Sequence, residues 1–558
     1  MQRPGKLNSR LGARVCSVAG RFLMEVEQPR RAQRWFERAA RLDPADPTAL
    51  HGLGVSLLRG GDRGPVRAPG VGLVLGDVGD PVSARAVFVR ALELQPRHEG
   101  AIAGLADALI GSGDLDAADE ALARTTSSSR TIVQARVGLL VARGRMRGAL
   151  LRSEASALTE HYRTLLADQP DDSTRHKLVR HLVQIGHFDE AGEVAWPDAP
   201  DDATSWTIDQ LVDATPHPSF DWLFVEHARL LALGRARDSH EVKLRLAQRP
   251  SPPLNRRSPL SHLFVAVQQD AYANGPESAL QLLGRHSLAF AADDEKLALR
   301  KLEADLRLSC GDAAPLRRLR TQWLAHHPPA EALFADTVSG ANVLVIGPSL
   351  STQPTATEVT AADVIVTTKR PHPLARAGQC QIAYLNDASA QLDAGGIAGL
   401  LDATADEVRA VVRPSMLTFA PTRVPIDSRV RVMPCEDSNA LLGTRFGIQR
   451  ILYDLATYDV GSITLTGVDF FLSPTPYRQG YDNEVAEIYD PQGLQPAGSV
   501  APHDYLADYV FTRTLERAGL ISGSALVTPL LGFTNDEYLR RLEAHLRPSI
   551  PTGKHPAR

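Results

Sequence analysis

Two patterns of apolar and polar positions divide the chain. Up to about residue 325, apolar residues recur at helical spacing, and the helical segments end in proline or glycine. From about residue 340, short apolar runs rich in β-branched residues alternate with helical segments, and the first of these runs is Asn342–Ile346. This alternation predicts an α/β region over 340–545 with a mainly parallel sheet. The run His326-His327-Pro328-Pro329 marks the predicted boundary.

The helical region, residues 29–325, contains three similar units. Each unit reads helix, proline, helix, glycine, and the units cover 32–61, 84–114 and, more weakly, 162–191. They resemble tetratricopeptide repeats, whose stacked helix pairs form an extended concave surface. We therefore expect a TPR-like all-α repeat domain that binds a protein partner or associates with a second copy of itself.

The composition is that of a soluble globular protein of 558 residues, with 43% hydrophobic and 23% charged residues. The net charge of −4 gives no nucleic-acid footprint, and the four dispersed cysteines form no CxxC pair. No apolar run is long enough for a transmembrane segment. We expect a cytoplasmic protein, and a peripheral position at the inner membrane face stays open. Residues 1–28 and 546–558 are expected to be poorly ordered tails.

The candidate chemistry lies where predicted strands end. The strand Asn342–Ile346 runs directly into Gly347-Pro348-Ser349, and ligands of open α/β sheets bind at the carboxyl ends of strands. The next cluster contains Asn386, whose amide can bond a ribose or a phosphate. A third cluster, Thr466–Phe471, places Asp469 just after Gly467.

Two further positions follow that third cluster. Tyr477 and Tyr481 carry hydroxyls that can hold a departing phosphate without a metal, and His503 precedes Asp504. A histidine oriented by an acid can act as a base near neutral pH. The alternatives are that the two tyrosines pack a loop and that His503 caps the helix that begins near Tyr505.

In their order, these motifs make residues 340–525 resemble the bacterial sialyltransferases that use CMP-sialic acid. The shared elements are Val345–Leu350, Tyr384-Leu385-Asn386, Gly443–Gly447, Thr466–Phe471 with Tyr477, and His503-Asp504 with Asp508. Three positions depart from the family: Ile346 and Thr368 stand where it has asparagine, and Phe471 stands where it has a tyrosine.

The resemblance implies a Rossmann-like glycosyltransferase domain. The reaction would be an inverting, metal-independent transfer of sialic acid or a related sugar from a CMP-sugar to a hydroxyl of a glycan or protein acceptor, with no cofactor. His503 would be the general base, and Tyr477 would donate to the leaving phosphate. The substrate-binding residues would be Gly347, Pro348, Ser349, Thr368, Asn386, Thr444, Gly467, Asp469 and Tyr481.

Two other functions fit the same residues. A Gly-Pro-Ser strand end with a later Gly-x-Asp also resembles pterin pyrophosphokinase-like domains and the related flagellin-modifying proteins, which implies ATP binding or modification of a protein with a nonulosonic acid. The third possibility is a TPR scaffold with a catalytically inactive α/β domain, which Ile346 and Phe471 favour.

Overall fold

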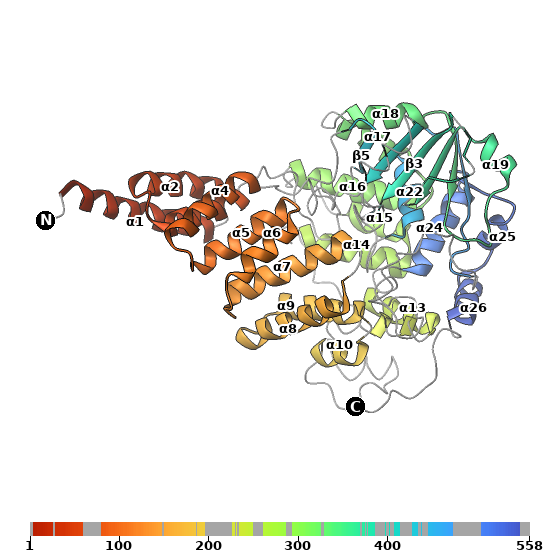
Figure 1. The fold of residues 1–558 in the computed structure, drawn as a ribbon. Coiled ribbons are helices and arrows are strands. Elements are labelled where there is room, and N and C mark those ends of the chain that lie inside the picture. Colours follow the sequence, from red (N-terminus) through yellow and green to blue (C-terminus); the bar gives the residue numbers. More distant parts are fainter. Residues whose placement is uncertain are drawn as a thin grey trace.

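The computed structural model consists of an extended array of helices that leads into a unit with a parallel sheet (Figure 1). None of the helices it describes is long and apolar enough to cross a membrane. The structure describes residues 4–25, 28–59, 80–147, 150–185, 187–195, 226–228, 230–231, 234–248, 260–285, 293–324, 329–368, 371–373, 375–376, 378–385, 397, 401, 407–412, 427–433, 437, 445–472 and 504–546.

Successive helices pack side by side in the N-terminal array. Proline occupies the first turn of several of them, where its missing N–H costs nothing and its fixed φ suits the helix. Aspartates cap others, as where the Asp80 carboxylate accepts from the Ser83 amide at 2.9 Å. The helices are α1 (Pro4–Glu25), α2 (Pro29–Leu42), α3 (Pro47–Arg59), α4 (Pro81–Leu94), α5 (Glu99–Gly111), α6 (Leu115–Ala123), α7 (Arg130–Arg147), α8 (Arg152–Asp168), α9 (Asp172–Gln184) and α10 (Phe188–Ala195).

The three predicted units correspond to α2–α3, α4–α5 and α8–α10, so the helical reading of this region is confirmed. The expectation for residues 1–28 is wrong, because Pro4–Glu25 forms α1. Small residues allow α1 to pack against the array. Cys16 is buried against Ala39 of α2 and Ala49 of α3, so α1 packs closely while most of its remaining surface is charged or exposed.

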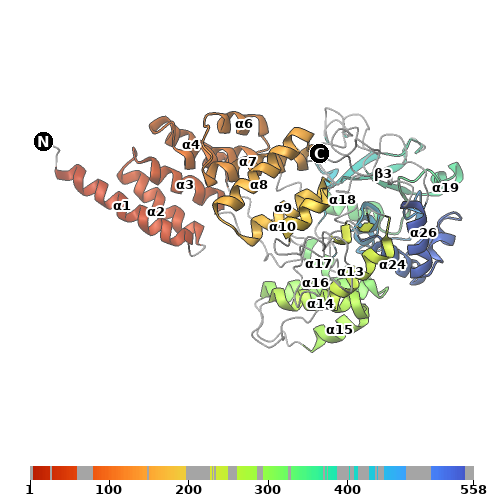
Figure 2. The same cartoon turned by 90° about the horizontal axis from the view of Figure 1, so that it is seen from below.

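A second set of helices follows this array along the chain, and several of them share a hydrophobic core with the sheet. Figure 2 shows α13 beside the C-terminal helices, in agreement with the contacts between α13 and α26. The set is α13 (Ala236–Ala247), α14 (Leu260–Asn274), α15 (Pro276–Gly284), α16 (Asp293–Ser309), α17 (Ala314–Leu324) and α18 (Pro329–Val338).

In the part of the chain that the structure describes, the sheet has seven strands, all parallel, in the order β5-β4-β3-β2-β1-β6-β7. The mainly parallel sheet predicted from the alternating pattern is therefore confirmed. The strands are β1 (Asn342–Ile346), β2 (Val364–Thr368), β3 (Cys380–Leu385), β4 (Val408–Val412), β5 (Val430–Val432), β6 (Ser462–Thr466) and β7 (Ser522–Gly523), and the helices of this unit are α19 (Ala356–Ala361), α22 (Gly447–Ala456), α24 (Tyr505–Arg517), α25 (Thr528–Leu531) and α26 (Asn535–Leu546).

Alternate residues of each strand serve opposite faces of the sheet. Val343 and Val345 of β1 join a large core that also contains Leu308 of α16 and Leu316 of α17. Ile346 belongs to a smaller cluster on the other face. Because α16 and α17 precede residue 325, the hydrophobic core runs across the predicted boundary at 326–340.

Buried polar contacts reinforce this packing. The Tyr453 hydroxyl of α22 donates to Asp305 of α16 at 2.7 Å. On the same side of the sheet, Arg431 of β5 is buried between Glu331 of α18 and Asp454 of α22, and its Nη2 donates to Asp454 at 3.0 Å. These contacts fix α16, α18 and α22 relative to the strands, since a buried charge is stable only when it is paired.

Candidate functional site

The strand order reverses between β1 and β6. Strands β1 to β5 add in one direction, and the chain then returns to the other side of β1 to form β6 and β7. In open parallel sheets the carboxyl ends of the strands at such a switch point diverge and leave a crevice for ligands. The sequence-predicted Gly347-Pro348-Ser349 and Gly467–Asp469 segments follow β1 and β6, so both lie at this point.

The two loops are bonded to one another through their backbones. The Gly347 amide donates to the Thr466 carbonyl at 2.8 Å, and the Ser349 amide donates to the Gly467 carbonyl at 2.8 Å. A Cβ on Gly347 would lie 2.3 Å from the Gly467 oxygen, and Gly467 itself has φ +64°. Glycine is therefore required here for the approach of two chain segments and for a left-handed turn.

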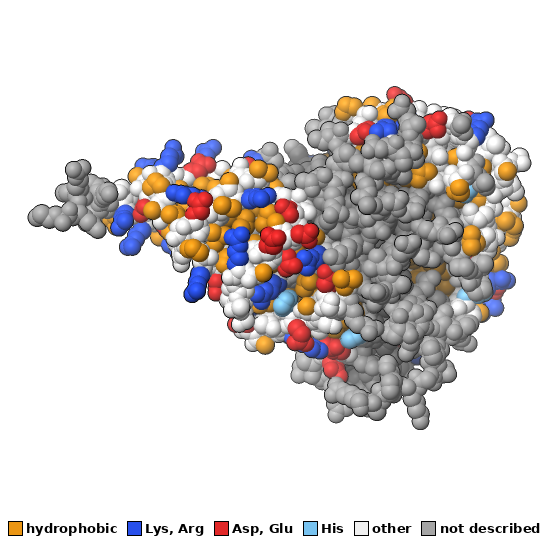
Figure 3. Space-filling model, in the orientation of Figure 1, with side chains coloured by type: hydrophobic (Ala, Val, Ile, Leu, Met, Phe, Trp, Pro, Cys, Tyr) orange, Lys and Arg blue, Asp and Glu red, His pale blue; other side chains and the backbone are white. Residues whose placement is uncertain are grey.

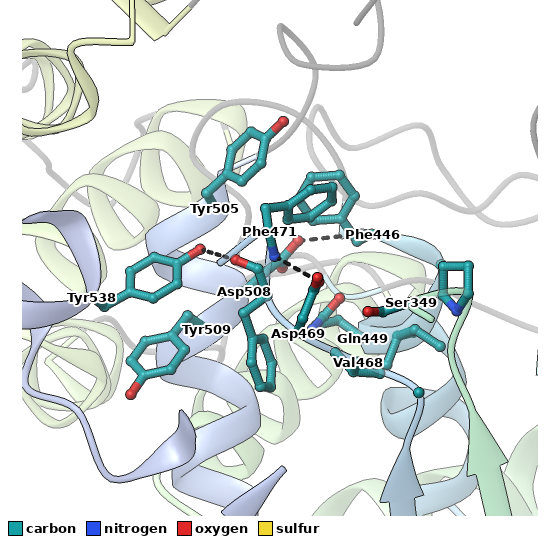
Figure 4. A pocket seen from close by; sticks show the side chains of 15 residues that line it. Ser349, Phe446, Gln449, Val468, Asp469, Phe471, Tyr505, Asp508, Tyr509 and Tyr538 are labelled. Atoms are coloured by element: carbon teal, nitrogen blue, oxygen red, sulfur yellow. Dashed lines mark hydrogen bonds between the residues drawn. The ribbon is translucent and has the colours of Figure 1, made fainter. Parts of the chain in front are cut away.

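A pocket of about 70 Å³ lies next to these loops, between the strand ends and the helices α22, α24 and α26. Ser349 and Asp469 lie on the strand side, and Tyr538 lies across from them (Figure 4). The described lining consists of Pro348, Ser349, Phe446, Gly447, Ile448, Gln449, Gly467, Val468, Asp469, Phe470, Phe471, Tyr505, Asp508, Tyr509 and Tyr538.

The turn after β6 is strained. Phe470 and Phe471 have φ of 53° and 61°, a left-handed conformation that bulky residues rarely adopt. The Asp469 carboxylate accepts from the Phe471 amide at 3.0 Å, and the Phe471 ring packs 4.7 Å from the ring of Tyr505. Such strain persists only where neighbours enforce it, and it is common at binding and catalytic sites.

Asp469 offers a carboxyl with a raised affinity for protons. Its side chain is buried beside Ser349, and burial raises its pKa above the ordinary value. The Ser349 hydroxyl is also buried and shares a hydrogen bond of 2.8 Å with Ser351. Together they place one hydroxyl and one carboxyl at the strand side of a pocket whose described lining also includes six aromatic side chains, Phe446, Phe470, Phe471, Tyr505, Tyr509 and Tyr538.

Asp508 holds the beginning of α22. Its carboxylate accepts from the Phe446 amide at 2.8 Å and from Arg445 Nη1 at 3.1 Å. Burial raises the pKa of Asp508 to about 6, and the positive charge of Arg445 opposes the shift. Arg445 Nε donates in turn to the Asp437 carboxylate at 2.7 Å. The three side chains form a buried network that reaches the pocket lining at Asp508.

Asp504 caps α24. Its carboxylate accepts from the Ala507 amide at 2.9 Å and pairs with Lys243 of α13 at 3.0 Å. Burial opposes ionisation of Asp504, but Lys243 and the Ala507 amide outweigh it and hold the pKa of Asp504 well below its usual range. The predicted helix start near Tyr505 is confirmed, and Asp504 is the residue that caps this helix.

The structure brings together four of the predicted site residues, Pro348, Ser349, Gly467 and Asp469, in the lining of one pocket. Gly347 lies directly behind them. Thr368 ends the neighbouring strand β2, is buried and is not part of the lining. Five predicted residues lie outside the described residues, and their roles stay predictions: Asn386, Thr444, Tyr477, Tyr481 and His503.

Two departures from the sialyltransferase pattern have structural roles. Ile346 is buried against Val359 of α19 and Ile365 of β2, on the face of the sheet away from the large core. Phe471 packs between the rings of Phe446 and Tyr505. In both cases the apolar side chain serves packing, so neither position supplies a polar group to the pocket.

Sequence reasoning missed most of the aromatic lining. Tyr505 and Tyr509 could have been found, because their spacing puts them on the same face of α24 as Asp508, which the resemblance includes. Tyr538 of α26 has no local signal, since only tertiary packing brings its hydroxyl to the Phe470 carbonyl, at 3.2 Å. Within the described part of the chain, no three His, Cys, Asp or Glu side chains lie close enough to hold a metal ion.

Comparisons with known proteins support the repeat region. Residues 77–144 match the tetratricopeptide repeat family. No curated protein matches the chain. A tetratricopeptide repeat protein of Parabacteroides merdae has a solved structure with 11% identity and a TM-score of 0.30, over 52% of this chain and 98% of that one. The Naa15/Naa10 complex bound to HypK-THB has 13% identity and a TM-score of 0.24, over 55% of this chain and 49% of that one. Neither likeness is close enough to bear on function.

Proposed function

We propose that the α/β unit transfers a sugar from a CMP-sugar to an acceptor hydroxyl and that the TPR-like array binds a protein partner. One observation carries the first part: the pocket lies at the β1–β6 switch point and is lined by Ser349, Gly467 and Asp469. These residues belong to the motifs that resemble sialyltransferases, and the switch point is where open parallel sheets bind nucleotides.

The proposed chemistry is an inverting displacement. His503 takes the proton of the acceptor hydroxyl, whose oxygen bonds to the anomeric carbon while the bond to the CMP phosphate breaks. Tyr477 donates to the phosphate as it leaves. The described lining contains two carboxyls, Asp469 and Asp508, and no lysine, arginine or histidine. Neutral donors such as hydroxyls and backbone amides would therefore have to hold the phosphate.

An inactive TPR scaffold is the second candidate. Two observations favour it, the burial of Ile346 in an apolar cluster and the packing of Phe471 among aromatic rings. Under this candidate the α/β unit binds no donor, and the repeat array performs the whole function through its extended surface. A domain resembling pterin pyrophosphokinases differs from both, because it would bind ATP.

Nucleotide binding separates the three. We expect CMP to raise the melting temperature and to bind calorimetrically in EDTA, and CMP-sugars to be hydrolysed in preference to UDP- and GDP-sugars. Ser349→Ala should weaken CMP binding, because it removes a buried hydroxyl at the strand ends. Asp459→Asn is the matched control, since that side chain is 94% exposed and lies outside the pocket lining. Stabilisation by ATP alone would favour the pterin-type domain, and the absence of any nucleotide effect would favour the scaffold.

A further inference from the structure

Helix α1 carries an exposed apolar stripe. Leu11, Val15, Val18 and Phe22 have relative exposures of 65%, 61%, 57% and 61%. They are spaced by four, three and four residues, which puts all of them on one side of the helix. Single exposed apolar residues are ordinary on protein surfaces, but a continuous row of four marks an interaction surface.

Positive charge lies along one side of this stripe. Arg14 and Arg21 are exposed, and each lies three residues beyond a stripe residue, so their side chains flank it on the helix surface. Residues 1–59 contain eleven Lys and Arg but five Asp and Glu, an excess of six positive charges in a chain whose total is −4. Figure 3 shows Lys and Arg side chains along the edges of the N-terminal helices. The exposed arginines of α2 are Arg30, Arg31, Arg34, Arg38 and Arg41.

The stripe protrudes from the molecule. The buried face of α1, with Ala13 and Cys16, is directed at α2 and α3, and at about 100° per residue the stripe falls on the opposite side. Both ribbon views place α1 at the end of the array away from the sheet (Figures 1 and 2). Among the described helices, α1 packs on α2 and α3 through the face opposite the stripe, so the stripe lies on a convex surface.

We propose that α1 and α2 bind an anionic membrane surface, with the stripe immersed among the lipid headgroups. A single protruding apolar face with a basic row beside it is the arrangement of interfacial helices, which bury that face about 5–10 Å into the headgroup region. The arginines of α2 add attraction, because each Lys or Arg near an anionic bilayer strengthens binding about fivefold. This inference does not depend on the proposed enzymatic activity.

Two other occupants fit the surface less well. A partner helix prefers a groove between two helices, whereas this stripe lies on one convex helix. In a second copy, antiparallel α1 helices would bring the Arg14 and Arg21 rows of the two protomers together, and like charges at such distances repel. An extended anionic surface meets neither difficulty, because it accepts a convex helix and its negative charge attracts Arg14 and Arg21.

Flotation of the full-length protein with lipid vesicles tests the proposal. We expect binding to vesicles of phosphatidylcholine with phosphatidylglycerol, little binding to phosphatidylcholine alone, and loss of binding at high salt. The double variant Val15→Asp/Phe22→Asp should bind at least about tenfold more weakly, because charge replaces the immersed apolar groups. Arg14→Glu/Arg21→Glu should have a similar effect. The matched control is Val82→Asp on α4, which is 73% exposed and outside the stripe.

The stripe faces solvent, so these variants should keep the wild-type melting temperature, which checks that they fold. Three results would overturn the proposal: no flotation with anionic vesicles, equal flotation of the double variant, or equal binding to phosphatidylcholine alone. A wild-type dimer in light scattering that Val15→Asp/Phe22→Asp converts to a monomer, with no vesicle binding, would assign the stripe to a second copy instead.

Discussion

Lys243 and Asp504 form a buried ion pair that joins the helices before the sheet to the candidate site. Lys243 Nζ of α13 lies 3.0 Å from Asp504 Oδ2, and the two side chains are 2% and 15% exposed. Asp504 caps α24, whose next residues include Tyr505 and Asp508 of the pocket. The position of α24, and with it one wall of the pocket, therefore depends on a residue of the helical region.

Replacing Lys243 should lower the free energy of unfolding substantially. In Lys243→Met, Asp504 keeps its burial but loses its counter-ion, and breaking such a pair typically costs about 3–5 kcal/mol. Because Lys243 helps to depress the pKa of Asp504, the ion pair stabilises the fold above the unfolded value of 3.8, and that contribution is lost as pH falls through the lower folded pKa. The difference in the free energy of unfolding between the wild type and Lys243→Met, measured by urea denaturation, should thus be largest at neutral pH and smaller in acid.

The control for this prediction is Arg245→Met on the same helix. Arg245 pairs with Glu241, and both side chains are 42% exposed, so the change should cost less than about 1 kcal/mol. The double variant Lys243→Met/Asp504→Asn should recover part of the loss, since it no longer buries an unpaired charge. Equal stability of Lys243→Met and Arg245→Met would contradict the buried pair.

The sequence predicts most of the sheet but little of the pocket. Strand β1 is predicted to the residue, because a strand buried on both faces is a continuous apolar run. The two-residue strand β7, Ser522–Gly523, has no such run, and α1 was missed because small residues such as Cys16 bury it. The pairing of Lys243 with Asp504 arises only from tertiary packing, which local patterns do not encode.

The contact between the two strand-end loops predicts a strict demand for glycine. Gly467→Ala would place a Cβ 2.6 Å from the Gly347 oxygen at φ +64°, so steric overlap and left-handed strain combine. We expect a loss of about 2–4 kcal/mol. Gly192→Ala in α10 is the control: its Cβ meets nothing within 4 Å, and alanine should stabilise that helix by about 0.5–1 kcal/mol. The prediction would be refuted if the denaturant midpoints of both variants lay above that of the wild type, or both lay below it.

Asp508 should give the protein a measurable dependence on pH. Its pKa is raised from 3.8 to about 6 by burial, so the folded state binds this proton more tightly than the unfolded state. The resulting stabilisation is complete below about pH 4 and is lost as pH rises through about 6. Between about pH 4 and pH 6 the wild type should lose about 1.4 kcal/mol of unfolding free energy per pH unit through this group. Asp508→Asn should not show this loss. Parallel stability profiles of wild type and variant would argue against the shift.

Limited proteolysis tests the boundary predicted at 326–340. We expect a helical fragment and an α/β fragment after cleavage there. Because Leu308 and Leu316 share a core with the sheet, and Tyr453 bonds Asp305, the cleaved fragments should remain together in native gel filtration and separate only in denaturant. Cleavage scattered over the chain would count against the boundary, and fragments that separate under native conditions would count against the shared core.

The predicted role of His503 gives the sharpest test of catalysis. A positioned base contributes typically about a hundred- to ten-thousand-fold in rate, so His503→Ala should lower CMP-sugar turnover by that order. CMP affinity should stay nearly unchanged, because the base acts on the acceptor. Tyr477→Phe should differ by slowing departure of the phosphate. Since Asp504 already caps α24, His503→Asn cannot act by restoring a cap, and it should be as inactive as His503→Ala. Full activity in His503→Asn would show that His503 is not the general base. The proposed nucleotide binding would then be tested by CMP affinity alone.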